Sequence, residues 1–182
     1  MKLFLKYCED RVPVWPIAIL EEMHIEHEQE IVFGDLVLNA MIPENVFNEL
    51  QNKLSQNGFT IISEQNNILA QKVKYVVFDM LARQKLPEIN ISAYISNLLQ
   101  LNYTYLANVF SKVEGITVER FIILKKIEKA KHLLLYYDYE VKQVALMLNY
   151  SSIGHFCNQF KKITGTTPTE FKKQSLSIAA GK

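Results

Sequence analysis

The side chains with the clearest chemical pattern lie in one short stretch, residues 148–171 (LNYSSIGHFCNQFKKITGTTPTEF). Phe156, Phe160 and Ile163 recur at helical spacing and form an apolar stripe that a protein core would bury. The remaining surface of that helix carries the apolar Ile153 together with small, amide and basic residues: Gly154, Cys157, Asn158 and Lys161. Amides and ammonium groups make hydrogen bonds and charge pairs, so we expect this second face to be held against a partner.

The rest of the sequence offers no convincing catalytic set. It contains no glycine-rich phosphate loop and no Ser/His/Asp or Cys/His combination in a plausible arrangement. Cys8 and Cys157 are 149 residues apart, which gives neither a disulfide framework nor zinc-type spacing. We therefore expect a binding protein that is not an enzyme, has no cofactor and no metal, and works in a reducing compartment.

The bulk composition is that of a globular protein. At 182 residues and 49% hydrophobic side chains, the chain can bury a core and can hold one domain or two small ones. No apolar run approaches transmembrane length, and MKLFLKY at the start is too short for a secretory signal. The sequence predicts a cytoplasmic protein that makes no membrane contact.

The net charge of +1 hides an asymmetry between the two halves. Residues 1–84 carry 7 Lys and Arg against 12 Asp and Glu, whereas residues 85–182 carry 13 against 7. An acidic front and a basic back are typical of a nucleic-acid-binding module joined to something else. Chance also produces splits of this size, so charge alone does not decide the question.

The front half has the pattern of alternating strands and helices. Apolar periodicity predicts strands over 1–7, 24–33, 36–42 and 59–63, and helices over 11–23 and 43–58. Pro13 and Pro16 restrict the first helix, because proline is tolerated only in its entry or first turn. Gly58 is expected to form a left-handed cap at the end of the second helix, 43–58. This βαββαβ order predicts an α+β, ferredoxin-like sandwich with two helices on one face of a four-stranded antiparallel sheet.

The back half is predicted to be entirely helical, with helices from about 66 to 84 and from about 117 to 136. The lysines of the second of these fall on more than one side of it: Lys125, Lys126, Lys129 and Lys131.

A repeat of 50 residues runs through this helical half. Asn108 matches Asn158, Phe110 matches Phe160 and Gly115 matches Gly165, and each copy follows a short apolar helix, at 95–101 and 144–150. Each copy therefore consists of a helix, a tight turn and a second helix that ends at a glycine. This is the pattern of a helix-turn-helix, and it occurs twice. A stacked structural repeat is the alternative reading.

Local residue types support the turns of both copies. Asn149 suits a left-handed backbone conformation in the second turn. A hydroxyl of Ser151 or Ser152 is expected to cap the helix that follows, and Asn102 or Thr104 is expected to do so in the first copy.

Residues 91–173 resemble the paired helix-turn-helix DNA-binding domain of the AraC/XylS family of bacterial transcription regulators. The residues of the second copy that carry the resemblance are Ala145, Tyr150, Phe156, Phe160, Lys161, Gly165, Thr167, Pro168 and Phe171. The Ala–x–x–Leu–Leu passage at 130–134 resembles the family's long connecting helix. The resemblance implies double-stranded DNA as the partner, with two recognition helices in successive stretches of major groove.

The family's base-facing positions fall on seven residues here: Thr104, Ala107, Asn108, Ile153, Gly154, Cys157 and Asn158. Where Asn108 and Asn158 stand, family members often have Arg, so guanine readout is largely replaced by an amide suited to adenine. Ile153 is suited to a thymine methyl group. The alternative for each Asn is an ordinary solvated side chain, and Cys157 is interpreted as a packing or groove-facing residue rather than a redox sensor. The expected phosphate contacts are Lys112, Ser152, Lys161, Lys162, Lys172 and Lys173.

The role of the front half, residues 1–63, is left open by the sequence. It has no room for the β-barrel sensor of longer family members, and its strand order is similar to heavy-metal-associated domains. Their Cys-x-x-Cys motif is reduced here to Cys8 alone, and His24 and His27 are expected on opposite faces of a strand. We expect a sensor or a self-association module, followed by a DNA-binding domain over 64–182 that has RNA polymerase as a further partner. The rival interpretation is a metal-binding protein whose helical half contacts other proteins.

Overall fold

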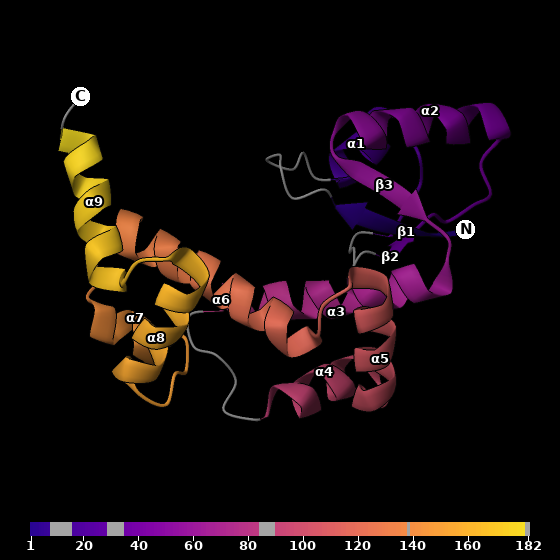
Figure 1. Cartoon of the computed structure of the whole chain (residues 1–182). Helices are drawn as coiled ribbons and strands as arrows, with labels where there is room; N and C mark the ends of the chain where they lie inside the picture. Colours follow the sequence, from indigo (N-terminus) through magenta and orange to yellow (C-terminus); the bar gives the residue numbers. More distant parts are fainter. Residues whose placement is uncertain (8–15, 29–34, 84–89, 138, 181–182) are drawn as a thin grey trace.

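The computed structural model describes residues 1–7, 16–28, 35–83, 90–137 and 139–180, and it has a small α+β part joined to a larger helical part (Figure 1). The α+β part consists of β1 (Lys2–Tyr7), α1 (Pro16–Glu22), β2 (Asp35–Val37), α2 (Glu44–Gln56) and β3 (Phe59–Ile62). The helical part consists of α3 (Gln65–Ala82), α4 (Ile91–Leu99), α5 (Tyr103–Glu114), α6 (Val118–Tyr136), α7 (Val141–Met147), α8 (Ile153–Thr164) and α9 (Pro168–Ala180).

The sheet has three strands in the order β2-β1-β3, and both pairs are antiparallel. The predicted four-stranded sheet is therefore not complete among the described residues. Of the predicted strand over 24–33, only an isolated bridge between His27 and Leu38 is present, and residues 29–34 lie outside the described ranges. His24 has a left-handed backbone (φ 55°) because it belongs to the turn that ends α1, where the Ile25 amide donates to the Leu20 carbonyl at 2.9 Å.

One face of the sheet packs against α1 and α2. Leu3 and Leu5 of β1 share this core with leucines and isoleucines of both helices, including Ile19, Leu20 and Leu50. Alternation along β1 explains why these two side chains point to the same side.

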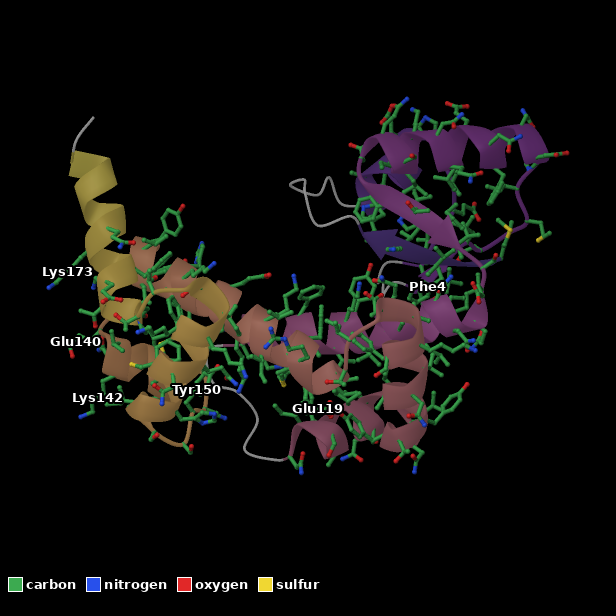
Figure 2. All side chains as sticks on the ribbon, in the orientation of Figure 1. Phe4, Glu119, Glu140, Lys142, Tyr150 and Lys173 are labelled. Atoms are coloured by element: carbon green, nitrogen blue, oxygen red, sulfur yellow. The ribbon has the colours of Figure 1, made fainter. Side chains whose placement is uncertain are left out.

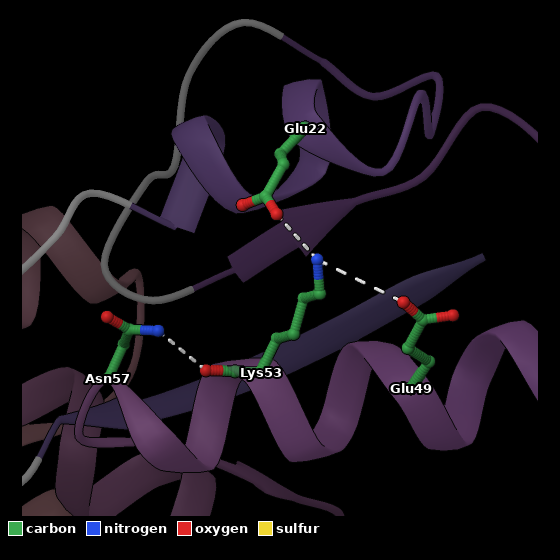
Figure 3. A network of polar contacts seen from close by, with 4 residues as sticks. All are labelled: Glu22, Glu49, Lys53 and Asn57. Carbon is green, nitrogen blue, oxygen red and sulfur yellow. Dashed lines mark hydrogen bonds and ion pairs between the residues drawn. The ribbon is translucent and has the colours of Figure 1, made fainter.

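Proline and glycine occupy the predicted positions at the ends of these helices. Pro16 is the first residue of α1, and Gly58 follows α2 with a φ of 85°. On the surface, the Lys53 ammonium of α2 lies 2.7 Å from the Glu22 carboxylate and 4.0 Å from that of Glu49 (Figure 3). Exposed ion pairs of this kind contribute little stability.

The opposite face of the sheet packs against α3, which the sequence had assigned only to the helical half. Phe4 is 4% exposed, and its ring centre lies 6.4 Å from that of Tyr75 in an edge-on arrangement. The Tyr75 hydroxyl donates to the Leu5 carbonyl at 3.0 Å, and Lys72 pairs with Asp35 at 2.9 Å. Phe4 lies where the sheet meets this helix (Figure 2), so α3 connects the two parts of the molecule.

Two separate cores line up along α6 in the helical part. Val118, Phe121 and Ile122 pack with α3, α4 and α5, whereas Ile127 and Leu134 pack with α7 and α8. The 19 residues of α6 span about 28 Å at about 1.5 Å per residue. The two helix-turn-helix units therefore lie at opposite ends of α6 (Figure 1). Among the described residues, no helix combines the length and the apolar character needed to cross a bilayer.

Candidate nucleic-acid interface

The two helix-turn-helix units repeat with a register of 50 residues. The second helix of the first unit is Tyr103–Glu114 and that of the second unit is Ile153–Thr164. The helices that follow them begin at Val118 and at Pro168. The repeat predicted from sequence is therefore present in the backbone, and α5 and α8 occupy equivalent places.

Polar side chains fix where α5 and α8 begin. The Asn102 amide oxygen accepts from the backbone N–H of Thr104 at 2.8 Å, and the Ser152 hydroxyl accepts from that of His155 at 3.1 Å. These are the N-caps that the sequence predicted, and each satisfies an amide that the helix leaves unpaired.

Left-handed residues fix where the helices of both units end. Gln100 and Asn149 have φ values of 52° and 51° in the turns, and Gly115 and Gly165 have values of 71° and 84° after the recognition helices. The left-handed conformation expected of Asn149 is confirmed. Glycine suits positions 115 and 165 because a Cβ atom strains this left-handed conformation.

The buried faces of α5 and α8 hold each unit together. Leu106 and Phe110 of α5 are at most 1% exposed, and Phe156 and Phe160 of α8 are fully buried. The centre of the Phe160 ring lies 5.8 Å from that of Phe156 and 5.5 Å from that of Phe171 of α9, and both pairs are edge-on. Such offset pairs are favourable for aromatic rings, and they fix the rotation of α8 about its axis.

With that rotation fixed, most of the predicted base-facing residues point to solvent. Thr104 and Asn108 are exposed on α5, and Gly154 and Asn158 are exposed on α8. Ile153, the first residue of α8, keeps 43% of its surface exposed. Asn108 and Asn158 occupy the same register in the two helices.

Ala107 and Cys157, also equivalent in the repeat, lie at the edge of this surface. Both are half-buried, Ala107 against the first core and Cys157 against the second. Burial raises the pKa of the Cys157 thiol, which disfavours the reactive thiolate form. This environment is that of a packing residue whose outer side borders the exposed face.

The structure adds a pair of residues that the sequence analysis did not include. Tyr105 on α5 is 48% exposed, and His155, its equivalent on α8, is also exposed in the first turn of its helix. The 50-residue repeat was the signal that could have identified them, because both lie one position after Thr104 and Gly154.

The predicted phosphate-binding residues divide into two groups. Lys112, Lys161, Lys162 and Lys173 are exposed. Ser152 is used as the N-cap of α8, and the partly buried Lys172 ammonium donates to the Tyr139 carbonyl at 3.2 Å. The last contact ties α9 to the segment before α7, so Lys172 has a structural partner within the chain.

The lysines of α6 are also engaged within the protein. The Lys126 ammonium donates to the Leu148 carbonyl at 2.8 Å and lies 5.2 Å from the centre of the Tyr150 ring. Burial lowers the pKa of Lys126 and that of Lys129, whose ammonium contacts the carbonyl oxygens of Leu81 and Arg83. These side chains therefore fasten α6 to the neighbouring segments.

A cavity of about 510 Å³ separates the two units, and it is lined by residues of α4, α5, α6 and α8. At one side the Tyr103 hydroxyl donates to the Glu119 carboxylate at 2.5 Å, and at the other the Tyr150 hydroxyl donates to Gln159 at 2.7 Å. The hydrogen bond from Tyr103 lowers the pKa of Glu119, and burial raises that of Tyr150 to about 12. Glu119 and Tyr150 belong to the two different units (Figure 2).

Metal-binding geometry does not occur in the part of the chain that the structure describes. No group of three or more His, Cys, Asp or Glu side chains in these residues could hold a metal ion. The predicted single soft ligand, Cys8, lies outside the described residues.

Comparison with known proteins matches residues 95–174 to a family described as "Helix-turn-helix domain". The chain is 23% identical over 166 residues to the uncharacterized HTH-type transcriptional regulator YtdP of Bacillus subtilis, covering 88% of this chain and 21% of that protein. It is 30% identical over 80 residues to the uncharacterized HTH-type transcriptional regulator YijO of Escherichia coli, covering 44% of this chain and 28% of that protein.

Among solved structures, a transcriptional regulator with an AraC-type DNA-binding domain from Chromobacterium violaceum superimposes with a TM-score of 0.50 at 20% identity, over 58% of this chain and 94% of that one. Residues 95–174 therefore form a helix-turn-helix domain with the fold of AraC-type DNA-binding domains. The chain spans less than a third of the length of either sequence relative above.

Proposed function

We propose that this protein is a sequence-specific DNA-binding transcription regulator whose recognition helices α5 and α8 enter successive stretches of major groove. The observation that carries the proposal is the 50-residue repeat of two capped recognition helices. Each helix has a buried apolar face and an exposed face, and the exposed face carries an asparagine at the same register in both. A major groove admits one α-helix at a time, and two equivalent helices on one rigid connector suit two such grooves.

The length of α6 supports this arrangement. Its 19 residues span about 28 Å, which is close to the rise of one turn of duplex, about 34 Å. Two recognition helices fixed near its ends would therefore approach the same side of DNA.

The exposed faces suggest how bases are read. Asn108 and Asn158 each present an amide that can pair with the N6 and N7 atoms of adenine, and Ile153 offers an exposed apolar group for a thymine methyl. Thr104, Ala107, Gly154 and Cys157 complete the proposed base-facing set. We add Tyr105 and His155 to this surface.

Phosphate contacts are assigned to side chains that position the protein without reading sequence. The exposed Lys112, Lys161, Lys162 and Lys173 are the main candidates. Ser152 and Lys172 stay in the proposed set with a smaller share, because each already has a partner within the chain.

For the front half we propose a ferredoxin-like domain over residues 1–63, ahead of the DNA-binding domain over 64–182. Its support is that both neighbours of β1 are antiparallel to it and that the His27–Leu38 bridge extends the sheet beyond β2. The role we assign to it is sensing or self-association. We place the protein in the bacterial cytoplasm, with RNA polymerase as the partner that a regulator of transcription addresses.

A titration of labelled duplex DNA at several salt concentrations tests the proposal. Affinity should fall as salt rises, with a slope of about −0.9 per phosphate neutralised, because binding releases condensed counterions. A folded chain that shows no salt-dependent affinity for any duplex would overturn DNA binding as the function.

A further inference from the structure

A second cavity, of about 550 Å³, lies at the junction between the α+β part and α3. Small-molecule sites commonly have this size and commonly form where two parts of a protein meet. Its walls come from β1, β2, β3, α2 and α3, so both halves of the chain contribute to it.

The register of the sheet explains why these side chains converge. Phe4 of β1 lies opposite Asp35 of β2 and opposite Ile62 of β3. Residues opposite one another in an antiparallel pair point to the same face, and on this face they meet Ile68 and Lys72 of α3. Phe4, Ile62 and Ile68 therefore form an apolar wall with charged groups beside it. Phe47 of α2, which packs against the core on the other face of the sheet, also lines the cavity.

The charged groups of this cavity do not balance. Lys2 and Lys72 each place an ammonium 2.9 Å from the same Asp35 carboxylate oxygen. One carboxylate neutralises only one of these two cations, so the charged lining residues carry a net charge of +1. The imbalance stands out because the surrounding residues 1–84 have 12 acidic side chains against 7 basic ones.

We propose that this cavity binds a small organic anion, a carboxylate joined to an aromatic or branched apolar body. The anion would sit against Lys72 and Lys2, and its body would lie on Phe4, Phe47 and Ile68. Charge-assisted hydrogen bonds to ammonium groups are stronger than neutral ones, and a mostly apolar wall with a few polar groups is the usual design of such sites.

The helix α3, which lines this cavity, also contacts the first recognition helix, α5. Lys72 lines the cavity, and two residues further along α3 the Lys74 ammonium pairs with Glu114, the last residue of α5, at 2.7 Å. Both side chains of that pair are largely buried, with 14% and 20% of their surface exposed. A ligand that shifts α3 therefore acts on α5, and this consequence, unlike the binding itself, rests on the proposed DNA-binding function.

Binding is tested by isothermal titration calorimetry of the full chain with phenylacetate up to millimolar concentration, and with phenylacetamide as its uncharged counterpart. We expect saturable one-to-one binding of phenylacetate, and affinity for the amide lower by roughly tenfold or more. No saturable heat with phenylacetate, or equal affinity for both compounds, would overturn the proposal.

Three variants, each checked for a wild-type circular dichroism spectrum, separate the site from a general effect of charge. Lys72→Gln should weaken phenylacetate binding roughly tenfold or more. Lys53→Gln removes the same charge from the far side of the α+β part, where Lys53 faces Glu22 (Figure 3), and should bind as wild type does. Asp35→Asn removes the competing carboxylate and should strengthen binding.

The direction of the change in phenylacetate affinity for Asp35→Asn is the most decisive result, because affinity should rise in this variant and fall in Lys72→Gln. A folded Asp35→Asn protein that loses affinity as Lys72→Gln does would show that the cavity does not select by charge, and the proposal would fall. A DNA titration with and without phenylacetate then reports on α5 separately. If calorimetry shows binding and DNA affinity is absent throughout, the ligand site stands and the DNA-binding proposal fails.

Discussion

The two helix-turn-helix units share one backbone plan but differ in what surrounds them. In the first unit α5 packs against α3, and α3 in turn packs against the sheet through Tyr75 and Phe4. In the second unit α8 packs between α6 and α9, with Phe171 of α9 closing the core over Phe160. The first unit is thus connected to the front half of the chain through α3, whereas the described core of the second unit is built from residues of α6, α7, α8 and α9 and the turns between them.

The exposed faces differ as well. At the position where α8 has the exposed Lys161, α5 has the half-buried Ser111, whereas Lys112 and Lys162 match. The last turn of α8 therefore carries two cations, which favours phosphate contact at that end. Under the proposed function, we expect the first unit to respond to changes in the front half and the second unit to make more of the phosphate contacts.

The largest expected effect concerns the core of the second unit. Phe160→Ala should reduce the free energy of unfolding by about 3–5 kcal/mol, because it leaves a cavity between Phe156 and Phe171. Chemical denaturation followed by circular dichroism measures it, with the exposed Lys162→Ala as a control close to wild type. A Phe160→Ala protein as stable as wild type would show that α8 is not packed as described.

The next effect distinguishes base reading from mere exposure. Asn158→Ala should weaken binding to a selected site by about 1–3 kcal/mol, because one bidentate pair with adenine is lost. Non-specific binding should stay nearly unchanged, since the amide carries no charge. Competition with duplexes altered one base pair at a time measures both quantities. An Asn158→Ala protein with the wild-type base preference would leave the side chain as a solvated residue only.

A smaller effect compares the two units directly. Lys161→Ala should weaken binding to all sequences alike and reduce the salt slope by about one, because one phosphate contact is lost. Ser111→Ala, at the equivalent place in α5, should leave the salt slope unchanged. Equal slopes for both variants and wild type would remove the proposed difference between the units.

The smallest effect is a dependence of stability on pH. Glu119 has a lowered pKa because it accepts from Tyr103, so its contribution to stability is present above its ordinary value of 4.5 and is lost as the pH falls through its value in the folded protein. Tyr103→Phe should therefore be less stable at neutral pH by less than about 1 kcal/mol, since the pair is exposed. Melting curves should converge on acidification. A Tyr103→Phe difference that persists in acid contradicts this origin, and Tyr105→Phe is the matched control.

The sequence was sufficient to predict the two helix-turn-helix units because periodicity and caps act locally. Ser152, Asn149 and the phenylalanines of α8 define where that helix begins, how its turn is made and which face is buried, and each rests on contacts within about one helical turn. The 50-residue repeat then transfers the same register to α5.

The packing of α3 on the sheet depends on contacts between distant segments, which no local pattern specifies. Phe4 lies between Lys2 and Lys6 on one side of β1, and an alternation with lysines gives no indication that this side is covered by a helix. In the structure the Phe4 ring is buried against α3. In the same way, the alternation of Ile25 with His24 and Glu26 predicted a strand, whereas Ile25 lies in the turn after α1. Alternation of apolar and polar residues indicates that one side of a segment is buried, but over a few residues it does not distinguish a strand from a turn.

The central claim, that α5 and α8 read DNA together, is tested most directly by selecting duplexes from a random pool with the full chain. We predict a consensus of two elements containing A·T pairs, with centres about one helical turn apart, because Asn108 and Asn158 occupy equivalent places at the two ends of α6. A consensus with a single element, or with G·C pairs alone, would contradict the claim.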